Sequence, residues 1–560
     1  MSSWPRTLAL LLAFVACAAF APLRRIDYVM TPQMQGAALT AMQVDVSFTG
    51  DASGETTLEL PDGWGGQNEL WRGISDLAVI SGATMSDGAD AAHRVLRHRP
   101  HARIRFRYRV VQDWQGVPSA EQGNPYRPIV QPSYFHMIGD TALVRPLLDD
   151  RTPVRVRASH VPTGWTFASD LQHRGLVLSK AAASVSVGGD YRISYANDRN
   201  IRTAIRGQWQ FTDAAFTARV AEIVAGHRSF WGDPSTPYLV TVTQVASPSQ
   251  GWLSIGGTGL DDAFAFFATP NAELDRITRT LAHESIHTWI PAAVGGMPEE
   301  HESQDYWFSE GFTDFYTGRL LVREGIWTPA QFADDLNEML RDYARSPVRN
   351  EPNSRVVADF WHNEDVGHLP YQRGRLLATI WDARLRANGG SMNDVVMAMR
   401  HRAESDHALH AAELFPVVAA AYHVDVVADI ARYADRGETI VLPEDTFAPC
   451  GRVTTRQAPV FHRGFDIDAT QAHNNVISGV VRSGPAYAAG MRDGMVLVRR
   501  EAGEIGDAEQ EIAYVVRDGE TQRTIRYMPR GAGTFTLQRL VIDSALAGDQ
   551  LAQCTRVLTG

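Results

Sequence analysis

Residues 283–287 read HESIH and lie in a stretch with helical periodicity. Residues four apart share a helix face, so His283 and His287 can direct their imidazoles at one metal ion. Neutral imidazoles are good zinc ligands, and Glu284 is placed to accept a proton from a water on that ion. The predicted helix has an apolar side formed by Leu274, Ile277 and Leu281. A proline stands near each end, Pro270 before it and Pro291 after it.

A second segment supplies the third ligand that a zinc site needs. Residues 307–321 read WFSEGFTDFYTGRLL, and Glu310 stands 23 residues after His287. Glu310 completes a His₂Glu set for one Zn²⁺ ion and leaves a fourth position open, as catalytic zinc sites do. Asp314 lies one turn further on and is predicted to orient a ligand histidine through its outer nitrogen. The alternative is that both acids are solvated, which the many neighbouring aromatic residues disfavour.

These two motifs carry a resemblance to a known family. HESIHTW followed by WFSEGFTDFY resembles the gluzincin peptidases, and in particular the glycyl aminopeptidase family, whose members have a C-terminal PDZ domain. Residues 371–374, Tyr-Gln-Arg-Gly, are similar to that family's Tyr-x-Lys-Gly segment, with Arg373 in place of Lys. The resemblance implies that Tyr371 donates a hydrogen bond to the oxyanion formed during peptide hydrolysis. The alternative is a packing residue that precedes a helix.

One part of the family pattern is missing. Relatives of the aminopeptidase type hold the substrate's free amine with a Glu in a Gly-Gly-Leu-Glu-His-like strand, whereas residues 256–262 here read GGTGLDD. Asp261 or Asp262 could supply a shorter carboxylate, or both could be turn residues. The strand around Gly257 could still pair with an extended peptide. The hydrolytic chemistry is therefore better supported than a preference for a free N-terminus.

The sequence as a whole is that of an exported zinc metallopeptidase. Zinc bound by His283, His287 and Glu310 is expected to activate water, with Glu284 as the base and Tyr371 steadying the oxyanion. The substrate is a peptide or protein, and aminopeptidase is the preferred specificity. Two alternatives stay open. One is an endopeptidase on the same scaffold, and the other is a non-catalytic PDZ-type peptide-binding protein with a structural zinc site.

The expected fold is multidomain α+β. An N-terminal β-sandwich-like domain is predicted for residues 26–200, since turn residues separate segments with period-two alternation. A thermolysin-like, mainly helical catalytic domain is predicted for residues 201–445, with a linker at 442–449. Short strands return in residues 455–545, where the core segment 476–498 resembles a PDZ domain.

The PDZ-like segment suggests a second binding site. Residues 463–466 could capture a peptide C-terminus through backbone N–H groups. The alternative is a small β-domain that packs on the catalytic unit and binds nothing.

Composition and the N-terminus bear on partners and location. A net charge of −11 over 560 residues argues against nucleic acid as a partner, even though four arginines share one face of strand 103–110. Residues 1–21 have the layout of a secretory signal peptide, which predicts a periplasmic or secreted protein. A retained membrane anchor and a lipid on Cys17 are the alternatives. No later stretch is apolar enough to span a membrane.

Two of the three cysteines flank the PDZ-like region. Cys17 lies at the predicted cleavage site, whereas Cys450 and Cys554 flank the PDZ-like residues. Two cysteines in an oxidising compartment are expected to pair, which would close a loop of about 105 residues.

Overall fold

A computed structural model describes most of residues 25–560; the residues it does not describe are 1–24, 121–122, 173–174, 198, 235, 248–250, 261, 299 and 406–407. The predicted signal peptide, Cys17 and Asp261 therefore lie outside the described residues. The chain divides into two compact units, one up to residue 221 and from 235 to 280, the other from 222 to 234 and from 281 to 560. Within the described part, no helix is both long and apolar enough to cross a membrane.

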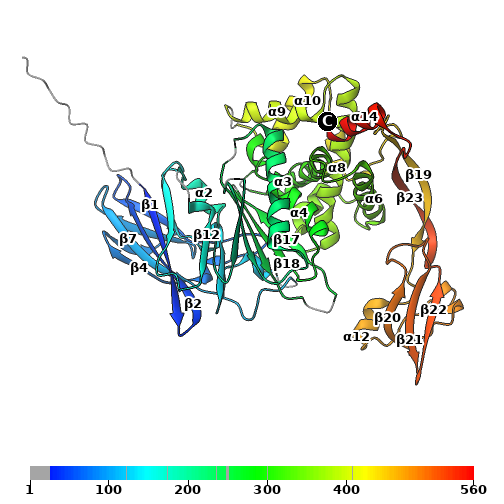
Figure 1. Cartoon of the computed structure of the whole chain (residues 1–560), viewed down its shortest axis with the longest axis horizontal. Coiled ribbons are helices and arrows are strands. Elements are labelled where there is room, and N and C mark those ends of the chain that lie inside the picture. The colour runs from blue at the N-terminus through cyan, green and yellow to red at the C-terminus, as the bar shows by residue number, and fades with distance from the viewer. Residues whose placement is uncertain are drawn as a thin grey trace, which may run out of the picture. The chain divides into compact units, whose positions relative to one another are not determined.

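The N-terminal part of the first unit is rich in β-structure, as the sequence predicts (Figure 1). A five-stranded sheet has the order β11 (Val154–Ala158), β1 (Ile26–Gln35), β2 (Ala38–Thr49), β7 (Arg103–Val110) and β4 (Ile74–Ser81). A four-stranded sheet consists of β10 (Arg145–Pro146), β3 (Glu55–Glu59), β6 (His93–His98) and β5 (Ala83–Asp87). Another consists of β12 (Thr166–Ser169), β13 (Val185–Gly189), β9 (Tyr134–Ile138) and β8 (Ile129–Gln131). Two one-turn helices, α1 (Gly139–Ala142) and α2 (Ser179–Ala182), lie between these strands.

Strand β7 shows why alternation predicted this region well. Its apolar residues Ile104, Phe106 and Tyr108 are fully buried, whereas the arginines between them lie on the other face. Arg107 and Arg109 form ion pairs with Asp45 (2.7 Å) and Asp76 (3.0 Å) of neighbouring strands. These contacts fit a solvated, charge-paired face.

A further sheet follows in residues that were expected to be mainly helical. Its order is β14 (Arg192–Ala196), β15 (Ile201–Arg206), β16 (Tyr238–Gln244), β18 (Ala263–Ala268) and β17 (Ile255–Gly259). Strands β15, β16 and β18 are parallel, and the two outer strands run antiparallel to their neighbours. A strand around Gly257 was expected here, and β14 falls in the predicted β domain. The buried strands β16 and β18 were not predicted, because short, buried apolar runs have no period that separates strand from helix.

Helices dominate the second unit, as predicted (Figure 1). α3 and α4 begin in the first unit and end in the second. The long helices are α3 (Asp213–Trp231), α4 (Leu274–Ile286), α5 (Tyr306–Arg323), α6 (Pro329–Arg345), α8 (Glu364–Ala387), α9 (Met392–Ala403) and α10 (Ala411–Ala421). Shorter ones are α7 (Asn353–Asp359) and α11 (Val427–Asp429).

Side chains cap two of these helices. The Thr328 hydroxyl accepts the Gln331 N–H in a capping box at the start of α6, and Ser391 caps α9. The expected start of α4 at Pro270 was wrong by four residues, because the chain turns through residues 270–271 before the helix begins at Leu274.

The C-terminal region begins and ends in the helical core. A two-stranded ribbon, β19 (Gly451–Phe461) with β23 (Arg530–Ile542), leads to a three-stranded sheet of β20 (Val496–Ala502), β21 (Ile512–Asp518) and β22 (Thr521–Tyr527) (Figure 1). Short helices α12 (Ile467–Ala472) and α13 (Pro485–Ala488) accompany this sheet, and α14 (Gly548–Thr559) ends the chain.

The predicted disulfide between Cys450 and Cys554 is confirmed, and both cysteines are fully buried in the same core as α5 and α6. The predicted linker has no helix or strand, yet Phe447 within it is buried in that core. The base of the ribbon is also clamped, because the Asn337 amide both donates to and accepts from the backbone of Leu540.

Candidate metal centre

His283, His287 and Glu310 come together as the sequence predicts. The Nε2 atoms of His283 and His287 lie 3.2 and 3.5 Å from Glu310 Oε2, respectively. The three donor atoms lie within 4.8 Å of one another. His287 follows the last residue of α4 in a tight turn, in which its N–H donates to the Glu284 carbonyl.

The spacing of these donors fits zinc. Zinc–nitrogen and zinc–oxygen bonds of about 2.0–2.1 Å at tetrahedral angles place neighbouring donors about 3.3–3.4 Å apart. The two distances to Glu310 Oε2, 3.2 and 3.5 Å, bracket that value. Two imidazoles and one carboxylate are also the donor set of catalytic zinc sites, which keep one position open.

Both histidines are held in the tautomer that zinc requires. Asp314 Oδ1 accepts a hydrogen bond from His283 Nδ1 at 3.0 Å, so the predicted orienting role of Asp314 has the contact it needs. The Ile290 carbonyl accepts one from His287 Nδ1 at 3.0 Å. Because an acceptor holds the proton of each Nδ1, Nε2 is the nitrogen of each ring that can bind a metal once its own proton is released.

Arg375 extends this arrangement one step further from the metal. Its guanidinium is almost fully buried, lies 3.9 Å from Asp314 Oδ2 and donates to Asp335 Oδ2 of α6 at 2.6 Å. Sequence analysis missed Arg375 and the Ile290 carbonyl. Arg375 stands four residues after Tyr371, and that spacing on one helix was the available signal.

Tyr371 lies beside the ligands, but its place in the secondary structure differs from the expectation. It lies inside α8 rather than before a helix, directly after Pro370. Its ring centroid is 5.8 Å from that of His283. Glu284 is half-buried on α4 next to the first ligand. The two predicted catalytic side chains therefore belong to the same local cluster as the ligands.

Two glycines bring α5 and α8 into backbone contact at this point. A Cβ at Gly374 would lie 1.8 Å from the Trp307 carbonyl oxygen, and one at Gly311 would lie 2.3 Å from the Gly374 Cα. No side chain fits in either place. Gly311 follows the ligand Glu310, and Gly374 is three residues after Tyr371, so this crossing sets the distance between those two side chains.

The ionisable groups of this cluster act strongly on one another. Burial alone would lower the pKa of His283, but hydrogen bonding to Asp314 and Glu310 outweighs burial and raises that pKa to about 10. Burial opposes ionisation of Glu310, yet the His287 charge and the contact with His283 hold the pKa of Glu310 well below its usual range. Burial and then the nearby carboxylates raise the pKa of the Tyr371 phenol well above its ordinary value. The Glu310 carboxylate and the two imidazoles thus stabilise each other's charged forms.

The predicted substrate-binding residues lie in the first unit. Gly257 is in β17, an edge strand. The Leu260 N–H donates to the Ala263 carbonyl, and the Thr269 N–H donates to the Ser254 carbonyl. Even-numbered residues of this strand therefore bond to β18, and the backbone N–H and C=O of Gly257 point to the open edge. The Tyr126 hydroxyl already donates to the Gly257 carbonyl at 3.2 Å.

Asp262 is engaged elsewhere. Its Oδ2 forms an ion pair with Lys180 Nζ at 3.0 Å. Asp261, the other predicted carboxylate, lies outside the described residues.

The predicted carboxylate-capturing loop at 463–466 is partly occupied by the chain itself. The Gly464 N–H donates to His462 Nδ1 at 3.0 Å, and the Asp466 N–H donates to the Ser478 carbonyl at 2.9 Å. Two of the backbone donors that could hold a peptide C-terminus therefore have intramolecular partners.

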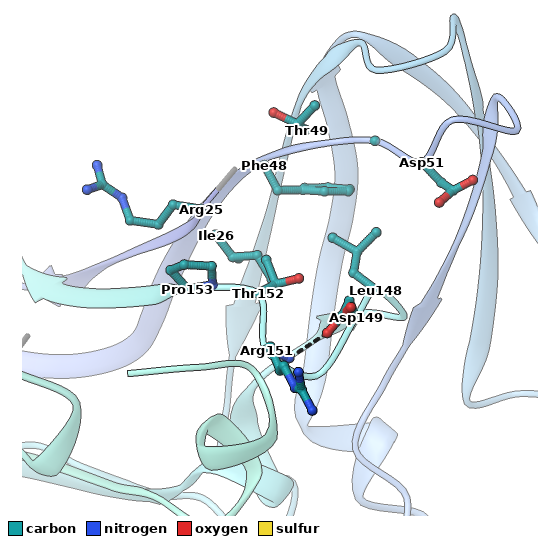
Figure 2. Close-up of a pocket in the computed structure, with 11 residues that line it drawn as sticks. Arg25, Ile26, Phe48, Thr49, Asp51, Leu148, Asp149, Arg151, Thr152 and Pro153 are labelled. Carbon is teal, nitrogen blue, oxygen red and sulfur yellow. Dashed lines mark hydrogen bonds between the residues drawn. The ribbon is translucent and has the colours of Figure 1, made fainter. Parts of the chain in front are cut away.

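A separate cavity of about 340 Å³ lies in the N-terminal sheets (Figure 2). Two arginines and two aspartates line it together with Phe48 and Leu148. The Arg151 N–H donates to Asp149 Oδ1 at 2.8 Å within its wall. None of the predicted site residues belongs to this cavity.

Comparisons with known proteins point to the same segment. Residues 276–363 match the M61 glycyl aminopeptidase family, a stretch that contains all three ligands and Asp314 and ends before Tyr371. No curated protein matches the sequence.

One solved structure shares the fold. The chain resembles an aminopeptidase N family protein from Idiomarina loihiensis with a TM-score of 0.64 and 15% identity, over 96% of this chain and 100% of that one. The M1 zinc metallopeptidase of Deinococcus radiodurans gives a TM-score of 0.45 at 14% identity, over 75% and 94%.

The family match and the donor set coincide in one segment. The chain is therefore a zinc-dependent metallopeptidase, and His283, His287 and Glu310 are the residues that fit one zinc ion.

Proposed function

We propose that this protein is an exported zinc aminopeptidase that hydrolyses peptides or small proteins. The observation that carries the chemistry is the convergence of two Nε2 atoms on Glu310, with both outer nitrogens held by acceptors. When bound there, zinc supplies a Lewis acid that polarises a carbonyl and lowers the pKa of water.

The residues of the chain divide the remaining work. Glu284 accepts a proton from the attacking water as its oxygen adds to the peptide carbonyl carbon, and passes that proton to the nitrogen of the leaving amine when the C–N bond breaks. Tyr371 donates a hydrogen bond to the carbonyl oxygen as negative charge develops on it. Asp314, with Arg375 behind it, keeps His283 in the ligand tautomer.

The preference for a free N-terminus rests on the family match. An extended peptide is proposed to add to the open edge of β17. The glycine at position 257 is required by packing within the sheet, because a Cβ there would lie 2.3 Å from the Phe264 ring. The ion pair of Asp262 with Lys180 favours the endopeptidase alternative, because it engages a carboxylate that could have held the amine.

A paired assay separates the two specificities. One peptide is supplied with a free and with an acetylated N-terminus, and a chelator-treated sample is the control. Cleavage of the free form alone supports the aminopeptidase. Equal cleavage of both forms would reject it in favour of an endopeptidase, and no metal-dependent cleavage of either would reject the proposed function.

Export, domain limits and the PDZ-like character of residues 455–545 are parts of the same proposal. The Cys450–Cys554 disulfide supports export, because disulfides persist in oxidising compartments. A periplasmic or secreted location, with a lipid-anchored or tethered form as the alternative, follows from the signal-like residues 1–21. The proposed domains are residues 26–200, 201–445 and 455–545. A peptide C-terminus remains the proposed ligand of the last one.

A further inference from the structure

Three buried polar side chains form a row behind the metal centre, which we call the Glu324 relay: Glu324, His227 and Ser285. Glu324 caps the C-terminal end of α5, the helix that carries Glu310. His227 lies on α3, and its Nε2 is 3.5 Å from Glu324 Oε1. Its Nδ1 is 2.7 Å from the hydroxyl of Ser285 on α4, which stands between the two ligand histidines. The relay thus joins both ligand-bearing helices.

Burial of these three polar side chains costs desolvation free energy. His227 is fully buried, and the Glu324 side chain is 7% exposed. A Cβ at Gly226 would lie 2.2 Å from Glu324 Oε1, so the carboxyl occupies the space above that glycine. Neither carboxyl oxygen of Glu324, nor His227 Nε2, has a hydrogen-bond partner among the described residues, so their 3.5 Å approach is a contact rather than a formed hydrogen bond. An apolar side chain would fill such a slot without the desolvation cost, so the polar row calls for a role beyond packing.

Counting donors and acceptors gives one consistent arrangement of protons. The Ser285 hydroxyl donates to the Ala282 carbonyl at 3.0 Å, so its oxygen accepts from His227 Nδ1. A neutral imidazole that carries its proton on Nδ1 presents a lone pair at Nε2. Among the described residues, the Glu324 carboxyl is the group that contacts Nε2, and it carries a donor for that lone pair only when protonated. His227 then donates to Ser285, and Ser285 to the backbone of α4. The first link, from Glu324 to His227, forms when Glu324 Oε1 moves closer to Nε2 than 3.5 Å.

The electrostatics support a neutral row. Burial raises the pKa of Glu324 to about 9, with Glu222 of α3 adding to the rise and Arg323 opposing it. Burial lowers the pKa of His227 to about 3. Both groups are therefore uncharged at neutral pH.

We propose that Glu324 and His227 are positioning residues, which hold α4 in the rotation that directs His283, His287 and Glu284 at the metal. A shift of Ser285 would move these side chains directly, because Ser285 is next to Glu284 and two residues from either ligand histidine. A loss of the donor at Glu324 releases His227, and through it Ser285, so that α4 can turn. The inference rests on the proposed function for its catalytic consequence, but not for its effect on zinc.

The test compares three variants of the full-length, zinc-loaded protein. Glu324→Met fills the slot but removes the donor, whereas Glu324→Gln keeps an N–H donor for His227 and cannot titrate. Thr317→Val is the matched control, because it removes a buried hydroxyl from the same helix, where that hydroxyl only donates to the Thr313 carbonyl. Zinc release to a competing chelator is measured from pH 7 to pH 10, beside kcat and KM.

Loss of a group that supports metal ligands typically weakens metal affinity about 10–100-fold, so Glu324→Met is expected to speed zinc release at least tenfold at pH 7 and to lower kcat more than KM changes. Glu324→Gln should largely restore both. The unmodified protein should approach the Met variant above about pH 9, whereas the Gln variant should not.

Equal zinc release from all four proteins would overturn the inference, as would a Gln variant no better than Met. Zinc release needs no substrate, so this result is independent of whether the protein cleaves peptides. If zinc release follows the relay but no peptide is cleaved, the proposed function fails and the inference stands.

Discussion

Gly374→Ala tests whether the backbone contact between α5 and α8 places Tyr371. The new Cβ would lie 1.8 Å from the Trp307 carbonyl oxygen and 2.6 Å from the Gly311 Cα. An ordinary contact starts near 3.4 Å, so the two helices must separate by roughly 1.6 Å along that line. Neither atom can rotate away, because both belong to helix backbone.

The separation of the helices acts directly on the ligand Glu310 and on Tyr371. Glu310 precedes Gly311, and Tyr371 is one turn before Gly374, so both side chains move with the crossing. A misplacement of about 1 Å can cost about 100-fold in rate, and overpacking typically costs about 1–3 kcal/mol of stability. We therefore expect kcat to fall about 100-fold. Zinc should be retained, because all its ligands lie on α4, in the turn after it, and on α5.

The assay measures kcat, KM, zinc content and thermal unfolding of the variant. Gly367→Ala is the control on the same helix, because its nearest contact, the Phe360 carbonyl oxygen at 3.1 Å, needs only a small adjustment. That control should keep nearly full activity. A folded, zinc-loaded Gly374→Ala protein with unchanged kcat would refute the idea that the crossing positions Tyr371.

Three further predictions follow from other contacts. Asp314→Asn removes the carboxylate that accepts from His283 Nδ1 and should weaken zinc binding about 10–100-fold in a chelator competition, whereas Asp334→Asn, its control on α6, should not. The folded protein keeps a proton on Glu324 up to about pH 9, whereas the unfolded chain releases it near 4.5. The free energy of unfolding should therefore fall as pH rises between these values, by at most about 1.4 kcal/mol per pH unit, and urea titrations of Glu324→Gln should lack that contribution. Replacing both Cys450 and Cys554 by Ser should lower the unfolding free energy by up to about 4.7 kcal/mol, measured in denaturant, because the bond closes a loop with a separation of 104 residues. An unchanged unfolding midpoint would contradict this last expectation.

The metal ligands were predictable because their signals are local. The spacing of His283 and His287 on one helix places them together whatever the rest of the fold does. Glu310 could be predicted because an acidic residue surrounded by aromatic residues in the sequence is not typical of a solvated surface. Even so, α5 is buried on nearly all sides rather than on one face, which its sequence period did not indicate.

The remaining parts of the site depend on contacts between distant segments. Arg375 reaches Asp314 only because α5 and α8 cross at Gly311 and Gly374, and a glycine in one helix does not show which other helix it will meet. The Ile290 carbonyl is a backbone group, to which sequence patterns give no identity. The Glu324 relay joins three helices through residues up to 97 positions apart along the chain. Such pairings follow from tertiary packing, which a single sequence does not contain.

The central claim is that His283, His287 and Glu310 hold a catalytic zinc ion with Glu284 as the base. Its most direct test is the zinc content and peptide hydrolysis of Glu284→Gln beside the unmodified protein. The account predicts about one zinc per chain in both proteins, with hydrolysis abolished in the variant. Full hydrolysis by a zinc-loaded Glu284→Gln protein, or an unmodified protein that cleaves peptides without any metal, would contradict it.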